Sequence, residues 1–313
     1  MSGRALIVVT SFAAAVDTSF ADRLRAHGVD VRVVTGLGNS SHEAEVIEAV
    51  EGANGIVAGS EMYSRGVLEK LPGLRAIVRA GAGTDSIDVE AARELGIVVD
   101  STPGANAESV ADYTLAMMLA SCRRIHENDR SVREGGWRIP QQGFDLHERT
   151  VGLIGFGAIG RAVARRLVGF GCRVVAHDSA WQEGQQPPEG IEMISFDELL
   201  EQAEVLSVHV PLLPETRDLI GAAELERLPR GAVVVNVARG GIVNEPALRT
   251  AVDAGHVSAA AVDVFTQEPV ALTNPLVGHP LILTSSHIAA FSEDGSATML
   301  DIAGDRVLTT LRT

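Results

Sequence analysis

Short apolar segments rich in β-branched residues alternate with helical segments along two stretches of this sequence. In the first stretch the predicted strands occupy residues 5–10, 29–35, 55–60, 74–80 and 96–101. In the second stretch they occupy residues 150–155, 173–178, 205–210, 232–237, 258–264 and 281–286. Strands that are apolar along their whole length and alternate with helices form parallel sheets covered by helices on both faces. The sequence therefore predicts an α/β protein with two doubly wound parallel sheets.

Two longer helices complete this pattern. Residues 106–134 are predicted to form one helix, apolar in its middle and charged at its end, and residues 292–313 an amphipathic C-terminal helix. The apolar run near the N-terminus has the outline of a signal peptide. A second strand follows it at the spacing of a βαβ unit, which favours a strand over residues 5–10. No apolar run approaches the ~18–20 residues of a membrane span, so we expect no membrane partner.

The overall charge is strongly negative. The chain has 26 Lys and Arg residues against 41 Asp and Glu residues, which gives a formal net charge of −15. Nucleic acid is therefore a poor partner, because its binding draws on clustered positive charge. A small anionic substrate needs only a local positive site and remains compatible with this composition.

The chain contains two cysteines, Cys122 and Cys172, both within apolar segments. A secreted disulfide framework would need more of them, so a reducing compartment fits best. We therefore expect a cytoplasmic protein whose cysteines are buried packing residues. We assign no residue to a metal site.

A glycine-rich turn follows the predicted strand at residues 150–155. The pattern G-x-G-x-x-G is formed by Gly155, Gly157 and Gly160. The first glycine permits a tight turn, the second lets a pyrophosphate approach the backbone, and the third lets the helix pack closely on the strand. Asp178 ends the next predicted strand, where a carboxylate accepts hydrogen bonds from the ribose hydroxyls of NAD and repels a 2′-phosphate. No arginine follows Asp178 within residues 179–184. The pattern predicts dinucleotide binding, with NAD favoured over NADP.

Charged side chains follow three consecutive predicted strands of the second stretch. Arg239 follows the strand at 232–237, and His287 follows the strand at 281–286. Asp263 lies at the end of the strand at 258–264, and Glu268 follows that strand. If these strands are parallel, all of these side chains emerge at the edge where open α/β sheets bind ligands. The set suits reduction of a 2-keto acid, in which an arginine binds the carboxylate or carbonyl and a histidine supplies the proton. A carboxylate beside that histidine would orient it.

These features converge on a known family. The segments "VRAGAGTDSID", "STPGANAESVADYTLAMML", "GGW", "TVGLIGFGAIGR", "HVPLLPETRDLI", "NVARGGIVNEPAL", "AVDVFTQEP" and "SSHIAAFS" occur in the order of that family's motifs. The sequence resembles the D-isomer-specific 2-hydroxyacid dehydrogenases over nearly its whole length, and in particular their phosphoglycerate-dehydrogenase-like branch.

The resemblance implies a role for individual residues. It makes Arg239, Glu268 and His287 the catalytic residues. It implies that the cofactor contacts Gly155, Gly157, Ala158, Ile159, Gly160, Asp178, His209, Pro211, Thr216, Ala238, Asp263 and His287. It implies that the substrate contacts Arg79, Ala82, Gly83, Arg239 and His287. Asp263 would hold the nicotinamide carboxamide, and the backbone of residues 81–83 would bind the substrate carboxylate.

The sequence departs from the family pattern at four positions. Ser286 stands where proline usually precedes the catalytic histidine, and Ala290 stands where glycine is common. Ser86 replaces a frequent asparagine, and Asp112 a frequent glutamate. None of these changes removes a catalytic side chain, but Ser286 bears directly on the pose of His287.

The resemblance also implies the domain organisation. Residues 1–101 and 289–313 would form a flavodoxin-like substrate-binding domain, and residues 102–288 a Rossmann NAD-binding domain inserted into it. We expect no regulatory domain after the C-terminal helix. The family further implies a homodimer formed through the NAD-binding domains.

The resulting prediction is an NAD-dependent oxidoreductase that interconverts a D-2-hydroxy acid and a 2-keto acid. The resemblance favours 3-phosphoglycerate dehydrogenase, with glyoxylate/hydroxypyruvate reductase as the alternative. A formate dehydrogenase is disfavoured by Glu268, since the resembling enzymes have glutamine there. An NAD(H)-sensing corepressor would retain similar site residues and stays open at this point.

Overall fold

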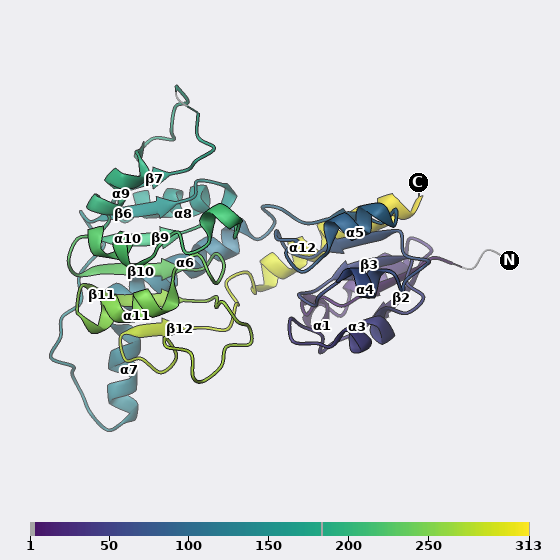
Figure 1. Ribbon diagram of the computed structural model, residues 1–313, viewed down its shortest axis with the longest axis horizontal. Helices are drawn as coiled ribbons and strands as arrows, with labels where there is room; N and C mark the ends of the chain where they lie inside the picture. The colour runs from purple at the N-terminus through teal and green to yellow at the C-terminus, as the bar shows by residue number, and fades with distance from the viewer. Residues whose placement is uncertain (1–3, 183, 313) are drawn as a thin grey trace. The chain divides into compact units, whose positions relative to one another are not determined.

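The computed structural model describes residues 4–182 and 184–312. The chain divides into two compact units (Figure 1). Unit 1 comprises Met1–Asn106 and Ala290–Thr313, and unit 2 comprises Ala107–Ala289. The chain therefore leaves unit 1, builds unit 2 and returns to unit 1.

Unit 1 is built on a five-stranded parallel sheet. Its strands are β1 (Leu6–Val9), β2 (Asp30–Val33), β3 (Gly55–Ala58), β4 (Ala76–Arg79) and β5 (Val98–Asp100). They lie in the order β2-β1-β3-β4-β5, which is the flavodoxin-like order of a doubly wound sheet. The apolar run at the N-terminus is thus strand β1, buried over Ile7, Val8 and Val9. Both the predicted fold and the predicted strands of unit 1 are confirmed.

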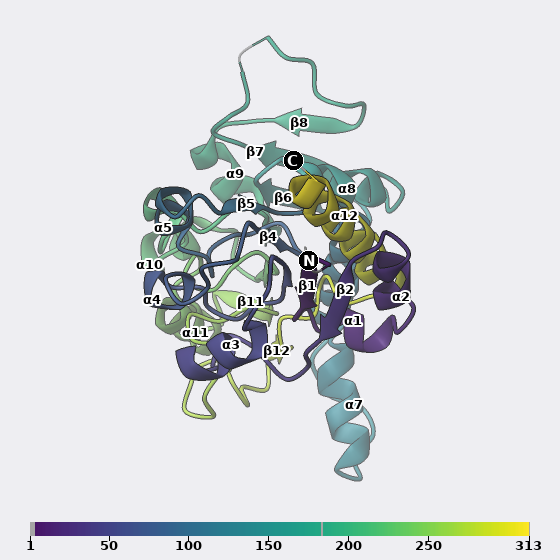
Figure 2. The same cartoon turned by 90° about the vertical axis from the view of Figure 1, so that its right-hand side faces the viewer.

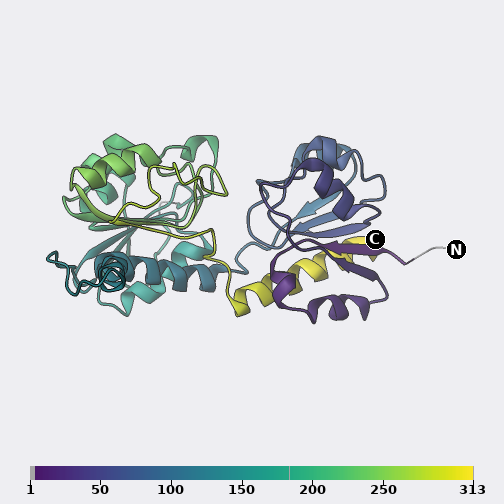
Figure 3. The same ribbon diagram turned by 90° about the horizontal axis from the view of Figure 1, so that it is seen from below.

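Helices cover both faces of this sheet, as Figure 3 shows from below. One face carries α3 (Glu43–Val50), α4 (Arg65–Leu68) and α5 (Val89–Glu94). The other carries α1 (Ala13–Val16), α2 (Phe20–Arg25) and the C-terminal helix α12 (Glu293–Arg312). A Cβ atom on Gly55 would lie 2.7 Å from the Val307 side chain, so glycine lets α12 pack directly on β3. The last helix of the chain thus completes the core begun by the first strands.

Unit 2 contains a seven-stranded parallel sheet. Its strands are β6 (Thr150–Ile154), β7 (Arg173–His177), β8 (Ile191–Met193), β9 (Val205–Val208), β10 (Ala232–Asn236), β11 (Val257–Val262) and β12 (Ile282–Thr284). Their order is β12-β11-β10-β9-β6-β7-β8. Counted from β6, this is the Rossmann order 3-2-1-4-5-6 extended by one strand. The sequence pattern missed β8, a three-residue edge strand in which only Ile191 is buried, visible beside β7 in Figure 2.

The helices of unit 2 also lie on both faces of the sheet. Helices α6 (Ala107–Cys122) and α8 (Ala158–Val168) pack together on one face. Helices α9 (Phe196–Gln202), α10 (Ala222–Arg227) and α11 (Glu245–Asp253) cover the other, around an aliphatic core. Among the residues that the structure describes, no helix has both the length and the apolar character needed to cross a bilayer.

The single helix predicted over residues 106–134 is wrong. The segment forms α6, which ends at Cys122, and α7 (Ile125–Arg133), with Arg124 between them in the left-handed conformation (φ 54°, ψ 37°). The backbone N–H of Phe144 donates to the Cys122 carbonyl at 2.9 Å and so takes an acceptor at the end of α6. The Arg124 guanidinium then binds both carboxylate oxygens of Glu127 at 2.9 Å. A loop from further along the chain therefore contacts the backbone at the end of α6.

The crossings between the units differ slightly from the predicted bounds of 101/102 and 288/289. Thr102 remains with unit 1, because its N–H donates to the Gly81 carbonyl and its hydroxyl accepts from the Gly81 N–H, both at 2.9 Å. Ala289 remains with unit 2, because its N–H donates to Asp263 at 2.8 Å. These hydrogen bonds connect Thr102 to unit 1 and Ala289 to unit 2.

Candidate active site

The glycine turn joins β6 to α8 in unit 2. Gly155 has φ +97°, and a Cβ atom there would lie 2.7 Å from the backbone of His209. A Cβ atom on Gly160 would lie 2.2 Å from the Gly155 carbonyl oxygen, whereas one on Gly157 would have no protein atom within 4 Å. The first and third glycines are therefore required by packing. The second borders open space, as expected where a phosphate approaches the backbone.

Asp178 lies directly beside this turn, at the end of β7. Its Oδ2 atom accepts the backbone N–H of Phe156 at 2.7 Å, and its Oδ1 atom that of Ala180 at 2.8 Å. A carboxylate offers about four acceptor positions, so capacity remains for ribose hydroxyls. Asp178 lines a cavity of about 590 Å³ together with Phe156, Gly157, Arg161, Ala180, Trp181, Gln185 and Gln186. This volume lies within the ~300–1,000 Å³ of ordinary ligand pockets.

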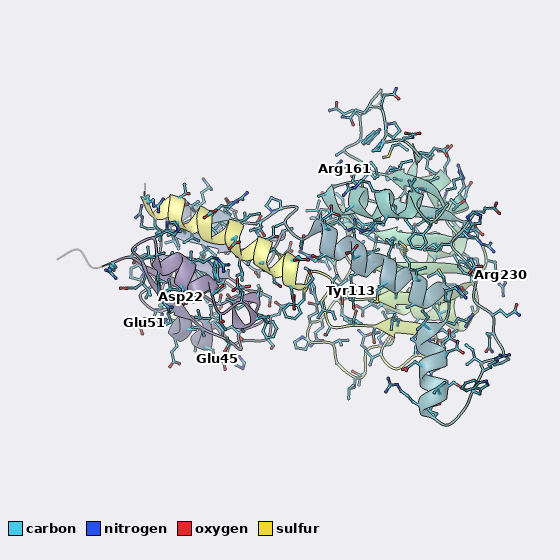
Figure 4. The ribbon with its side chains drawn as sticks, turned by 180° about the vertical axis from the view of Figure 1, so that it is seen from behind. Asp22, Glu45, Glu51, Tyr113, Arg161 and Arg230 are labelled. Carbon is cyan, nitrogen blue, oxygen red and sulfur yellow. The ribbon has the colours of Figure 1, made fainter. Side chains whose placement is uncertain are left out.

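The first turn of α8 presents Ala158 and Ile159 beside the same loop. Backbone N–H groups at the N-terminus of a helix have no intrahelical partner and bind phosphate readily. Arg161, labelled in Figure 4, donates to the Phe156 carbonyl at 2.8 Å and so stays at the cavity wall. The geometry fits the diphosphate and adenosine half of a dinucleotide.

Three further cofactor candidates lie in the segment after β9. His209 contacts the Ser207 hydroxyl through Nε2 at 3.0 Å, and burial lowers its pKa to about 4, so its ring is neutral at physiological pH. Thr216 donates to the Pro211 carbonyl at 2.6 Å and accepts the Leu213 N–H at 2.7 Å. These contacts shape the short turn at Pro214–Thr216.

The carboxyl ends of the strands place the candidates in one row along the edge of the sheet. Neighbouring strands of the sheet run in the order β7, β6, β9, β10, β11 and β12. The candidate that follows each strand therefore lies beside the next one, in the order Asp178, the glycine turn, His209, Arg239, Glu268 and His287. The strand order reverses between β6 and β9, which is where open α/β sheets bind nucleotides. One edge of unit 2 therefore holds both the nucleotide site and the candidate catalytic side chains.

Arg239 lies in a turn that touches the loop carrying Glu268. A Cβ atom on Gly240 would lie 1.9 Å from the backbone of Phe265, so only glycine lets these loops meet. The Asn236 side chain donates to the Arg239 carbonyl at 3.0 Å and accepts the Ala238 N–H at 3.1 Å. The turn after β10 is thereby fixed at both ends, and Ala238 forms its middle.

Glu268 and His287 form a direct pair. His287 Nδ1 lies 2.7 Å from Glu268 Oε2, and Glu268 Oε1 accepts the Phe265 N–H at 3.0 Å. The His287 side chain is 42% exposed and that of Glu268 is 18% exposed, so the acid lies behind the imidazole. With Nδ1 directed to the carboxylate, Nε2 is the ring nitrogen left to exchange a proton with a substrate.

Asp263, the remaining cofactor candidate, is fully buried at the end of β11. Its carboxylate accepts hydrogen bonds from the segment that carries His287. Contact with a nicotinamide carboxamide stays a prediction. Within the described part of the chain, no group of three His, Cys, Asp or Glu side chains could hold a metal ion.

The candidate substrate residues of unit 1 follow strand β4. Arg79 donates from Nη1 to the Ala80 carbonyl at 2.6 Å and packs against Gly81. The Gly81 N–H donates to the Thr102 hydroxyl, so this amide already has a partner. An anion at this loop would therefore rely on the N–H groups of Ala82 and Gly83.

A buried acid that sequence reasoning missed follows the neighbouring strand β3. Glu61 is 0% exposed, and its Oε1 atom accepts hydrogen bonds from the Thr10 hydroxyl, the Tyr63 hydroxyl at 2.7 Å and the Gly59 N–H at 3.1 Å. Burial and the Glu61 charge raise the pKa of Tyr63 well above its usual value. The sequence context "GSEMYS" gave no signal, since an acid in a loop is normally exposed.

The chain is similar to known proteins along most of its length. The sequence model described as "D-isomer specific 2-hydroxyacid dehydrogenase, NAD binding domain" matches residues 115–289. A D-3-phosphoglycerate dehydrogenase of Archaeoglobus fulgidus is 40% identical over 87% of this chain, and a glyoxylate reductase of Korarchaeum cryptofilum is 36% identical over 84%. The chain covers 51% of the former protein and 81% of the latter, so it spans about half the length of the phosphoglycerate dehydrogenases it matches.

The similarity extends to solved structures. A crystal structure of the TT0316 protein from Thermus thermophilus has a TM-score of 0.87 and 36% identity, and the match covers 98% of this chain and 97% of that one. The chain therefore belongs to the D-isomer specific 2-hydroxyacid dehydrogenase family, is similar to its phosphoglycerate dehydrogenases, and carries the family's NAD-binding domain over residues 115–289.

Proposed function

We propose that this protein is an NAD-dependent dehydrogenase that interconverts a D-2-hydroxy acid and a 2-keto acid. The observation that carries the proposal is the pair of His287 Nδ1 and Glu268 Oε2 at 2.7 Å, on the same sheet edge as the glycine turn and Asp178. A nucleotide site alone would fit many functions. A proton-exchanging histidine on the same edge, backed by a carboxylate, fits redox chemistry at a hydroxyl-bearing carbon.

The cofactor site fits NAD on three observations. Gly157 borders open space, where a phosphate can approach the backbone. The first turn of α8 offers N–H groups that have no partner within the helix. The Asp178 carboxylate can accept further hydrogen bonds and lines a cavity of about 590 Å³. When bound, NAD supplies or accepts the hydride. The protein contributes binding, orientation and charge.

Three side chains of unit 2 perform the remaining chemistry in this proposal. His287 donates a proton to the substrate oxygen during reduction of the keto acid and removes it during oxidation. Glu268 orients the imidazole through its contact with Nδ1 at 2.7 Å. Arg239 binds the substrate carboxylate and carbonyl through its planar guanidinium.

For the substrate, we propose 3-phosphoglycerate and 3-phosphohydroxypyruvate. The similarity to phosphoglycerate dehydrogenases supports this pair, and Arg79 at the end of β4 places a positive charge beside Gly81. Glyoxylate and hydroxypyruvate form the second candidate class. The similarity to a glyoxylate reductase favours them.

We further propose a cytoplasmic homodimer formed through the NAD-binding domains. Apolar side chains on and after α7 support an interface there, since Trp137 is 76% exposed, Ile125 55% and Val132 53%. Exposed apolar groups of this kind often mark protein contacts. Sedimentation of the purified protein, with Trp137→Ser as the dissociating variant, tests the dimer.

A panel of 2-keto acids assayed with NADH, and of D-2-hydroxy acids with NAD, tests the activity. Steady turnover of at least one pair, with faster turnover of the D isomer, supports the proposal. NADH binding without turnover of any pair would instead support a nucleotide-sensing protein. The ranking of 3-phosphohydroxypyruvate against hydroxypyruvate and glyoxylate identifies the substrate class.

A further inference from the structure

Three hydrogen-bond donors of unit 1 converge on one oxygen of a buried acid, Glu61. Its Oε1 atom accepts from the Thr10 hydroxyl, from the Tyr63 hydroxyl at 2.7 Å and from the Gly59 N–H at 3.1 Å. These four residues form the Glu61 cluster, and all of them are buried. A buried acid is costly to the fold unless hydrogen bonds satisfy it. None of the proposed catalytic residues belongs to this cluster, so its role lies elsewhere.

The Glu61 cluster joins the carboxyl ends of two neighbouring strands. Thr10 follows β1, whereas Gly59 and Glu61 follow β3. A Cβ atom on Gly59 would lie 2.6 Å from Glu61 Oε2 and 2.9 Å from the Thr10 carbonyl oxygen. Any side chain at position 59 would therefore displace the acid from the strand ends. The strand order reverses between β1 and β3, which is where doubly wound sheets bind ligands.

Tyr63 connects this cluster to the loop after β4, residues 81–88. Its backbone N–H donates to the Ser86 carbonyl at 2.7 Å, and its carbonyl accepts the Asp88 N–H at 2.9 Å. Tyr63 and Ile87 thereby form an isolated parallel bridge. Tyr63 thus binds the acid through its side chain and the end of the 81–88 loop through its backbone.

The 81–88 loop carries the residues that we assign to the substrate carboxylate. Its start is attached through the Gly81 N–H, which donates to the threonine hydroxyl after β5 at 2.9 Å. Its end is attached through Tyr63. Between these attachments Ala82 is exposed and Gly83 is partly exposed. The positions of their N–H groups therefore depend on both attachments.

We propose that Glu61 and Tyr63 are positioning residues that hold the 81–88 loop for the substrate carboxylate. Glu61 fixes the phenol of Tyr63, and the backbone of Tyr63 fixes the end of the loop. This inference rests on the proposed function, because it concerns the place that the substrate carboxylate would occupy. It assigns Glu61 no contact with the substrate, since Glu61 has no exposed surface.

The test compares Glu61→Met, Glu61→Gln and Tyr63→Phe with the wild-type protein. Methionine at position 61 has a similar length but offers no oxygen to the three donors. Glutamine keeps an amide oxygen that can take the place of Oε1, so it is the conservative rescue. Phenylalanine at position 63 keeps the ring and removes only the hydroxyl, which keeps the test available if Glu61→Met does not fold.

The matched control is Val307→Ala on α12. Val307 is fully buried on the other face of the same sheet, where it packs at Gly55, the first residue of β3. Its truncation leaves a cavity in the core and lowers the stability of unit 1. It does so at the end of β3 opposite to the Glu61 cluster.

Amide exchange and kinetics together separate positioning from a loss of stability. Hydrogen exchange of the Asp88 amide reports the attachment of the loop and does not depend on turnover. The Arg75 amide, which donates to the Asn54 carbonyl at 2.8 Å before β4 and β3, is the internal reference. Kinetics with 3-phosphohydroxypyruvate and with hydroxypyruvate give KM and kcat separately, and fluorescence titration gives the affinity for NADH.

We expect Glu61→Met and Tyr63→Phe to exchange the Asp88 amide faster by about fivefold or more, with the Arg75 amide unchanged. In Tyr63→Phe, KM should rise by about 2–12-fold, the effect of one hydrogen bond. The rise should be equal for both keto acids, because both carry the carboxylate. Glu61→Met should show a larger rise, since all three donors lose their acceptor.

The other quantities should stay near their wild-type values. In both variants kcat and the affinity for NADH should remain within about threefold, because the nucleotide site and the proposed catalytic residues belong to unit 2. Glu61→Gln should exchange the Asp88 amide and bind substrate as the wild-type protein does. Val307→Ala should lower the melting temperature and leave KM unchanged.

The proposal is overturned if the Asp88 amide exchanges at the wild-type rate in both Glu61→Met and Tyr63→Phe. It is also overturned if KM is unchanged in both variants, or if Val307→Ala raises KM as much as they do, since stability alone would then explain the effect. Should the wild-type protein turn over no 2-keto acid, the proposed function fails. The exchange rates then still decide whether the Glu61 cluster holds the loop.

Discussion

Glu268 binds His287 with one carboxylate oxygen and the backbone of its own loop with the other. The Oε2 atom lies 2.7 Å from His287 Nδ1, and Oε1 accepts the Phe265 N–H at 3.0 Å. Burial alone raises the pKa of Glu268. This effect of burial is outweighed by the hydrogen bond and charge of His287, by the hydrogen bond from the Phe265 N–H and by the charge of Arg239. The pKa of Glu268 is therefore lowered. The carboxylate is therefore ionised throughout the physiological pH range and places a full negative charge beside the imidazole.

Glu268→Gln removes that charge while keeping the shape. For keto-acid reduction His287 Nε2 donates the proton, and the Glu268 carboxylate holds Nδ1 at 2.7 Å. Glutamine cannot ionise, so the variant should have a lower kcat/KM and should lack the acid limb that belongs to the Glu268 carboxyl. At the acid end, wild-type activity should persist until the pH falls below the ordinary range of a glutamate, because the pKa of Glu268 is lowered.

The measurement is a pH profile of kcat/KM for both proteins with saturating NADH. Glu192→Gln, on an exposed acid that pairs with Arg173, is the matched control and should leave the profile unchanged. Coincident profiles for Glu268→Gln and wild type would exclude Glu268 from the proton relay.

His287→Ala should lower kcat by about 10²–10⁴-fold, the usual contribution of a positioned acid or base. NADH affinity should stay within about threefold, because the glycine turn and Asp178 lie on other strands. Stopped-flow turnover and fluorescence titration measure the two quantities. A variant that retains full turnover would require another proton donor.

The strands and the glycine turn could be predicted because their signals are local. Buried parallel strands are apolar along their length, and Gly155, Gly157 and Gly160 are spaced by the turn itself. The row of Arg239, Glu268 and His287 followed from one further rule, that parallel strands share a carboxyl edge.

What the sequence could not predict depends on contacts between distant residues. The break after Cys122 lies where the Phe144 N–H binds the Cys122 carbonyl, and residues 106–134 contain no glycine or proline that would mark it. Glu61 is buried by Thr10 and Tyr63, although glutamate in a loop is normally exposed. The hydrogen bonds of Asp263 to the segment that carries His287 likewise arise only when β11 and β12 are adjacent.

Cofactor choice should favour NADH over NADPH by at least about tenfold in kcat/KM, the scale of one unfavourable charge contact of ~1.4 kcal/mol. The reason is the Asp178 carboxylate at the wall of the cavity beside the glycine turn. Asp178→Ala should reduce this ratio, since the cation of Arg161 remains at the same cavity. Kinetics with both cofactors measure the ratio. Equal efficiencies in the wild-type enzyme would refute NAD preference.

Arg79→Ala tests whether the substrate carries a phosphate. The guanidinium lies at the end of β4 beside the loop of Ala82 and Gly83, and a charge-assisted contact to phosphate is worth ~1.5–3 kcal/mol. The variant should therefore raise KM for 3-phosphohydroxypyruvate by about 10–150-fold and change KM for hydroxypyruvate much less. Arg65→Ala is the matched control, because the Arg65 guanidinium pairs with Glu94 at 2.8 Å and is engaged on the surface.

Steady-state kinetics of wild type and both variants with the two substrates give the answer. An equal rise in KM for both substrates would mean that Arg79 acts through the loop at Gly81, against which its guanidinium packs. Faster turnover of glyoxylate than of 3-phosphohydroxypyruvate by the wild-type enzyme would reject phosphate recognition.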